Sequence, residues 1–183
     1  TALTAQMLEM VPEGPIASAE GLSYAEVLES FRQCSTADIS RAGYASADSG
    51  LAWFLQQNSL PACPPDILSG GLRRSIFGED CCLTKHPLVF AGEGVEPGVH
   101  PHVSTGVRVA SFDALIRHYK FANNPLVRDR RSISEGSIPH GEDALRARRM
   151  AAEPDLSLCP PEARVFPGLA ALQDEGFLRR GTE

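Results

Sequence analysis

The sequence lacks the long hydrophobic runs that would place it in a membrane. No apolar segment reaches about 18 residues, so we expect no transmembrane segment. The first residues show no secretory signal pattern of a basic start, an apolar stretch and a small-residue cleavage site. Because the chain begins at Thr1 rather than at methionine, this absence says little about localisation.

The sequence also lacks the cysteine spacing of a zinc site. Its five cysteines are Cys34, Cys63, Cys81, Cys82 and Cys159, and none forms a C-x-x-C pair. The adjacent Cys81 and Cys82 could be joined only through a strained ring. We therefore expect five free thiols and a reducing compartment.

Positive charge is scarce overall, with a formal net charge of −6, which argues against nucleic acid as a general partner. The charge is uneven along the chain. Residues 1–60 are acidic, whereas residues 117–149 are rich in arginine. The basic stretch could meet phosphates or an acidic protein partner, or it could be a solvated helical surface.

What the sequence does contain is enough material for one domain with a core. The chain has 183 residues, 43% of them hydrophobic, and its 16 glycines and 14 prolines indicate many turns. We expect strands at 3–11 and 81–90, and an exposed loop at 91–102. The segment 111–121 alternates like a further strand.

Helices are indicated later in the chain and once near its start. Ser23 and Glu26 form a capping box before an apolar stripe of Tyr24, Val27, Leu28 and Phe31. Helices are also expected after Asn124 as N-cap with Pro125 at N1, over 141–153, and over 166–177 with Pro167 at N1 and Gly176 at C′. The expected fold is α/β or α+β, with a mixed sheet over residues 1–122 and a helical extension, 123–183, packed on the same domain.

Three short stretches carry candidate chemistry. Gly70 and Gly71 could let a ligand approach the backbone while Arg73 or Arg74 binds a phosphate, although turn glycines beside surface arginines are a common alternative. Glu79 and Asp80 could supply a general base or simply be a solvated turn. His100 and His102 have a chelating spacing but no obvious third ligand.

The sequence "LIRHYKF" raises a sharper possibility. On a strand, Ile116, His118 and Lys120 would share one face, so the imidazole and the ammonium would point into one space. A lysine rarely lies inside a protein without a partner. The alternative is an amphipathic strand with no site.

Several stretches, in order, resemble the later half of family 2-type glycosyltransferases of the GT-A fold. They are "MLEMVPEGP", "GGLRRSIFG", "LTKHPLV", "HVSTG", "LIRHYKF" and "DLSLCPPEARVFPGLAALQDEGFL". The resemblance implies a nucleotide sugar as substrate and Mn²⁺ or Mg²⁺ at His118. It further implies that Gly70, Gly71, Arg73, Arg74, Lys85 and Lys120 lie near the donor diphosphate, with Glu79 and Asp80 as candidate bases.

The chain departs from that family in lacking its first half and the acidic D-x-D metal motif. Two hypotheses follow. The chain is an acceptor-side half that needs a missing N-terminal segment or another subunit for activity. Alternatively, it is a non-catalytic structural or interaction subunit of a larger complex, with no cofactor, built on a degenerate transferase fold.

Overall fold

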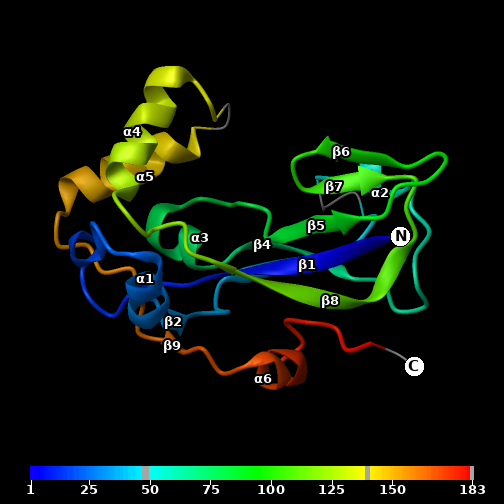
Figure 1. Ribbon diagram of the computed structural model, residues 1–183, viewed down its shortest axis with the longest axis horizontal. Helices are drawn as coiled ribbons and strands as arrows, with labels where there is room; N and C mark the ends of the chain where they lie inside the picture. The colour runs from blue at the N-terminus through cyan, green and yellow to red at the C-terminus, as the bar shows by residue number, and fades with distance from the viewer. Residues whose placement is uncertain (47–49, 139–140, 182–183) are drawn as a thin grey trace.

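The computed structural model describes residues 1–46, 50–138 and 141–181 (Figure 1). The strands are β1 (Ala2–Glu9), β2 (Gln33–Cys34), β3 (Ile39–Gly43), β4 (Asp66–Gly70), β5 (Thr84–Val89), β6 (Glu96–His100), β7 (Val103–Thr105), β8 (Val109–His118) and β9 (Arg164–Val165). The helices are the 3₁₀ turn η1 (Ile16–Ala19) and α1 (Tyr24–Ser30), α2 (Ala52–Leu55), α3 (Leu72–Phe77), α4 (Pro125–Glu135), α5 (Glu142–Ala152) and α6 (Leu169–Asp174).

The centre of the fold is a mixed sheet in the order β5-β1-β8. β1 runs antiparallel to β5 and parallel to β8. Backbone hydrogen bonds extend the sheet, because Leu83 N–H donates to Leu68 O and Gly70 N–H donates to Cys81 O. They connect β4, and β3 beside it, to the segment that leads into β5. The expected mixed sheet with flanking helices is therefore confirmed.

The strand register separates the two faces of the sheet. Ala5 pairs with Lys85 on one side and Ala114 on the other, so these side chains share a face. Glu9 lies further along the same face and pairs with His118. The opposite face carries Gln6, whose side-chain oxygen accepts a hydrogen bond from Thr84 Oγ1.

The main hydrophobic core joins the sheet to helices from both ends of the chain. It includes Leu8 from β1, Phe31 after α1, Phe77 from α3 and Leu172 from α6, all buried. Phe77 stacks on Phe121, with ring centroids 5.5 Å apart. This packing fixes α3 and the turn after β8 next to each other, and these are the elements that carry the charged cluster described below.

Several local predictions are confirmed. The capping box at Ser23 and Glu26 is formed, with each side chain bonded to the other residue's backbone N–H. Pro125 begins α4, α5 lies within the expected range, and Gly176 has a positive φ of 73° just after α6. All five cysteines are free. Across the part of the chain that is described, no helix is long and apolar enough to span a bilayer.

Other local predictions are wrong. Tyr24 is 77% exposed rather than part of the buried stripe, because it lies in the first turn of α1 and points to solvent. The 91–102 loop contains β6, which pairs with β7. Asn124 has φ 57° and makes no side-chain cap, and Pro167 precedes α6 rather than starting it. The segment 123–183 contains β9 as well as helices, and β9 pairs with β2.

Gly106 provides a test of the packing around the β6–β7 hairpin. It has φ +70°, and a Cβ there would collide with the carbonyl oxygen of Gly94. Gly98, in β6, has φ +65° with nothing near its missing Cβ. Gly98→Ala should cost only the left-handed strain of about 1–2 kcal/mol. Gly106→Ala should cost about 1–3 kcal/mol more from overpacking, measured by urea denaturation. Equal losses of unfolding free energy in the two variants would contradict the close approach of Gly106 to the Gly94 carbonyl oxygen.

Candidate anion-binding site

Glu9 and His118 lie at the carboxyl ends of two neighbouring parallel strands. They are direct partners in the β1–β8 register, and His118 Nδ1 lies 3.0 Å from both carboxylate oxygens of Glu9. The carboxylate accepts from Nδ1–H, which orients the ring and leaves Nε2 for another group. The His118 side chain is 35% exposed. The carboxyl edge of parallel strands is where open α/β sheets bind ligands.

Arg73 ties α3 to this pair of residues. Its Nε lies 2.8 Å from Glu9 Oε1, an ion pair without the alignment of a directed hydrogen bond, and its Nη1 donates to Glu79 Oε1 at 2.6 Å. All three side chains are buried. Arg73 therefore neutralises Glu9 and restrains it beside His118.

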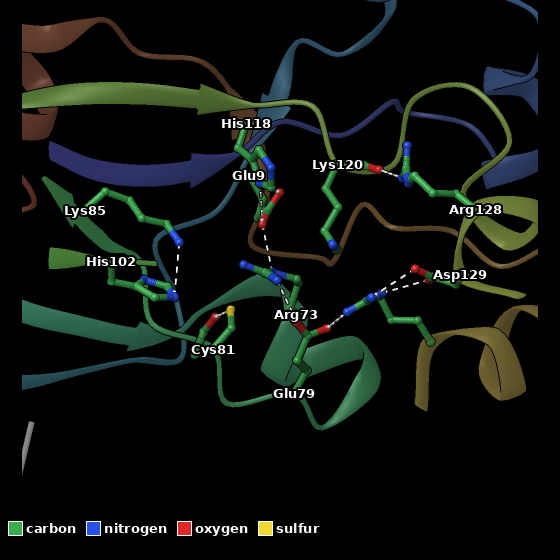
Figure 2. Close-up of polar contacts among 12 residues, drawn as sticks. Glu9, Arg73, Glu79, Cys81, Lys85, His102, His118, Lys120, Arg128 and Asp129 are labelled. Carbon is green, nitrogen blue, oxygen red and sulfur yellow. Dashed lines mark hydrogen bonds and ion pairs between the residues drawn. The ribbon is translucent and has the colours of Figure 1, made fainter. Parts of the chain in front are cut away.

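Arg146 extends the chain of ion pairs into the helical pair α4 and α5. Its Nη1 donates to Glu79 Oε2 at 2.7 Å, and its Nε and Nη2 donate to the two oxygens of Asp129 at 2.8 and 2.9 Å. The guanidinium is about as buried as any group in the protein, with 1% of the side chain exposed. The result is a continuous row, His118–Glu9–Arg73–Glu79–Arg146–Asp129, shown in part in Figure 2.

Lys120 lies in the turn after β8, since the strand ends at His118 rather than continuing to 121. The lysine still points to the same space as His118, near Arg73 (Figure 2). Within the described residues its ammonium has no hydrogen bond or ion pair. Burial, followed by the positive charges of Arg146 and Arg73, lowers the pKa of Lys120. Glu79 and Asp129 act on the ammonium in the opposite sense, but neither lies within ion-pair distance, so its N–H groups remain for an anionic ligand.

Lys85 lies on the other side of the Glu9–Arg73 contact, where its Nζ is 3.2 Å from His102 Nε2 (Figure 2). Burial lowers the pKa of Lys85. Lys85 and Lys120 are the only two lysines in the sequence. Both flank the same charged cluster, whereas of the 15 arginines only Arg73 and Arg146 belong to the row of ion pairs.

Four candidate residues lie outside this cluster or are already engaged. Gly70 and Gly71 have positive φ, and a Cβ at Gly70 would collide with the Arg74 guanidinium. Gly70 therefore makes room for Arg74, and Gly71 packs against Ile39 and Leu83, so neither glycine opens space for a ligand. Arg74 forms an ion pair with the exposed Asp80 and also donates to Ser40 Oγ at 2.8 Å.

Glu79 occupies a position unlike that of a solvated turn. Its two carboxylate oxygens accept from Arg73 and Arg146, and its side chain is fully buried. With both oxygens engaged, Glu79 is poorly placed to accept a proton from a substrate hydroxyl. Its geometry favours a structural role in the row of ion pairs.

Sequence reasoning missed Glu9, Asp129 and Arg146. The signal for Glu9 was present, because a lone carboxylate within the apolar run "MLEMV" must find a buried partner. Arg146 and Asp129 gave no such signal, since charged residues on amphipathic helices usually face solvent. Their inward orientation depends on how α4 and α5 pack against α3.

The residues at His118 do not fit a divalent metal by themselves. Hard cations such as Mg²⁺ prefer several oxygen ligands. Glu9 is the carboxylate in contact with His118, and Arg73 already neutralises it. Among residues 1–46, 50–138 and 141–181, no group of three His, Cys, Asp or Glu side chains could hold an ion. Neither His100 nor His102 therefore belongs to such a group.

Scans against protein-family models, curated proteins and solved structures find no match to this chain. The function must therefore be argued from its own residues. The fold and the site define an α/β protein with a cation-lined cluster at the carboxyl ends of two parallel strands.

Arg146 is the residue whose loss should most damage the charged row. Arg146→Met removes the partner of two buried carboxylates, and breaking such a pair typically costs about 3–5 kcal/mol. Arg149→Met on the same helix removes only an exposed pair with Glu153, worth about 0.5 kcal/mol or less. Chemical denaturation of both variants measures the difference. Similar values for the two would show that the row contributes little to stability.

Proposed function

We propose that this chain is the acceptor-side half of a nucleotide-sugar glycosyltransferase with a GT-A-like fold, and that His118 and Lys120 bind the donor diphosphate. The observation that carries the proposal is the ammonium of Lys120, half-buried and without an ion pair among the described residues, beside a histidine at the carboxyl edge of β1 and β8. The ordered sequence motifs add support from resemblance alone.

The chemistry of sugar transfer would use these groups on the leaving side. As the glycosidic bond to the donor breaks, negative charge builds up on the diphosphate, and fixed cations stabilise that charge. Lys120 donates its N–H groups to phosphate oxygens. His118 donates Nδ1–H to Glu9, which orients the ring so that its Nε2 edge faces the diphosphate. Arg73 remains paired with Glu9 and so keeps that carboxylate beside His118.

This role needs groups that the described residues do not offer. Neither a carboxylate set for the metal nor a free general base lies in the cluster, because Glu9 and Glu79 are both engaged by arginine. We infer that the D-x-D carboxylates and the nucleotide-binding half come from a further segment or another subunit. The chain alone should then bind a diphosphate without transferring sugar.

A non-catalytic interaction subunit is the second candidate. It is favoured by large apolar side chains on and just after β5, where Leu88 is 51% exposed and Phe90 is 58% exposed. Such residues suit a surface covered by another protein. On this second candidate, the row of ion pairs would only hold the fold together, and diphosphates would not bind.

Binding of ADP, used as a simple diphosphate ester, separates the two candidates. Lys120→Met should weaken binding about tenfold or more, the effect of one charge-assisted hydrogen bond. Arg131→Met removes an exposed arginine of α4 and should leave affinity unchanged. Isothermal titration calorimetry on the whole chain measures both. Failure of the wild-type chain to bind ADP would favour the interaction subunit.

The pH dependence of that binding follows from the lowered pKa of Lys120. The ammonium is charged below this pKa, so affinity should be constant at neutral pH and fall as the pH rises, with a midpoint below the ordinary lysine value of about 10.4. Lys120→Arg keeps its charge over the whole range and should remove the alkaline loss. An unchanged midpoint in that variant would exclude Lys120 as the binding group.

Hydrolysis of a nucleotide sugar tests the catalytic claim directly. The isolated chain should show no Mn²⁺-dependent hydrolysis, and His118→Ala should change nothing in that assay while still weakening ADP binding. Metal-dependent hydrolysis by the wild-type chain that is lost in His118→Ala would show that the described residues are sufficient for catalysis.

A further inference from the structure

We propose that Lys85 and His102 form a second anion-binding site, separate from that of His118 and Lys120, which holds the phosphate or carboxylate of a ligand carrying an apolar group. That this ligand is the acceptor rests on the proposed function; the binding site itself does not. The proposal combines the protonation of His102, the charges around Lys85 and the apolar residues on the same face of the sheet.

His102 is held as a hydrogen-bond acceptor for Lys85. Its Nδ1 lies 3.2 Å from the carbonyl oxygen of Thr84, which can only accept, so Nδ1 carries the proton. Its Nε2 therefore presents a lone pair to the Lys85 ammonium. Burial, and next the charge of Lys85, lower the pKa of His102 to about 4, so the ring is neutral at pH 7.

Lys85 thus gains a hydrogen bond but no negative charge. Within the described residues, no carboxylate lies within ion-pair distance of its ammonium. Its neighbours Cys81 and Cys82 are neutral thiols, because burial raises the pKa of both, that of Cys81 to about 12. Glu9 is already paired with Arg73 and His118. An ammonium has three N–H groups, and His102 uses one, which leaves donors for an anion.

The backbone on both sides of Lys85 is fixed, which makes this a defined site rather than a mobile surface lysine. The β6–β7 hairpin carries His102, and the backbone N–H of His86 donates to the His102 carbonyl at 2.8 Å. Within the hairpin, Gly98 N–H donates to Ser104 Oγ at 2.9 Å. β5 and the hairpin are therefore joined directly next to the Lys85–His102 contact.

The backbone positions that carry the two lysines are well separated along the sheet. Lys85 pairs with Ala5, whereas His118 pairs with Glu9, four residues further along β1. At about 3.3 Å per residue, these positions are roughly 13 Å apart. Figure 2 shows Lys85 and Lys120 on opposite sides of Glu9 and Arg73.

An apolar row lies next to Lys85 on the same face of the sheet. Leu3 is two residues from Ala5 on β1 and pairs with Leu88, and the register shift between Leu3 and Ala5 accounts for the odd spacing of Leu88 from Lys85 on β5. Phe112 is two residues before Ala114 and shares that face. Leu88 and Phe112 are 51% and 47% exposed. A ligand with its anionic end on Lys85 can therefore lay an alkyl or aromatic group over this row.

The experiment uses the small number of lysines. A chain labelled with ¹³C at lysine Cε should show two lysine side-chain signals, assigned with Lys85→Arg and Lys120→Arg. Hexyl phosphate, hexanoate and inorganic phosphate, all as monomers in solution, are titrated in turn. We expect hexyl phosphate or hexanoate to move the Lys85 signal at concentrations that leave the Lys120 signal in place, and ADP to do the reverse.

Two variants test the two parts of the site. Lys85→Met should weaken hexyl phosphate binding about tenfold or more while ADP binding is unchanged. Leu88→Ser should remove most of the advantage of hexyl phosphate over inorganic phosphate, which we expect to be about tenfold from partial burial of the chain. Inorganic phosphate should bind this variant as it binds the wild type. Amide spectra check that both variants remain folded.

The outcomes are distinct for the two proposals. If hexyl phosphate and hexanoate leave the Lys85 signal unmoved, the second site is wrong, even when ADP still moves Lys120. If ADP leaves the Lys120 signal unmoved while hexyl phosphate or hexanoate moves the Lys85 signal, the second site is supported and the transferase proposal is wrong. A stronger response to hexyl phosphate than to hexanoate assigns the ligand as a phosphate, and the reverse assigns it as a carboxylate. A response of both lysines to each anion alike would overturn the separation into two sites.

Discussion

The buried row of ion pairs from His118 to Asp129 is the interaction on which the rest of this structure depends. It links a residue of β8 to one of β1, then α3, the turn after α3, α5 and α4. Buried charges are tolerated only when each finds a partner. Each internal member, from Glu9 to Arg146, has two. The relative placement of three helices and two strands is thereby fixed by one set of contacts.

The row itself carries three carboxylates and two guanidinium groups, so the positive groups left for a ligand are the two lysines beside it. Arg73 and Arg146 together meet Glu9, Glu79 and Asp129, so the carboxylates nearest to the site are all engaged. Lys85 and Lys120 are left at its two ends with no carboxylate partner among the described residues. Because the carboxylates are held by arginine and neither ammonium forms an ion pair within the described residues, the site is better suited to an anion than to a bare divalent cation.

The sequence predicted the elements better than it predicted their contacts. The capping box, β1, α5 and the strand that ends in His118 follow from local patterns, and local physics governs them. The strand expected through residue 121 ends at His118, so Lys120 lies in the turn that follows it. By contrast, Arg146 lies on a helix whose pattern resembles any charged surface. That side chain points inward because α5 packs on α3. A contact between distant segments of this kind produces no periodic pattern in the sequence.

The scarcity of lysine has a practical consequence. Reagents that acylate or cross-link side-chain amines find two targets in this chain, and both lie in the charged cluster. Amine coupling to a sensor surface or dye would thus modify the two groups that we propose as ligand-binding. Immobilisation through Cys63, an exposed thiol, leaves both amines untouched and keeps the cluster in its native charge state.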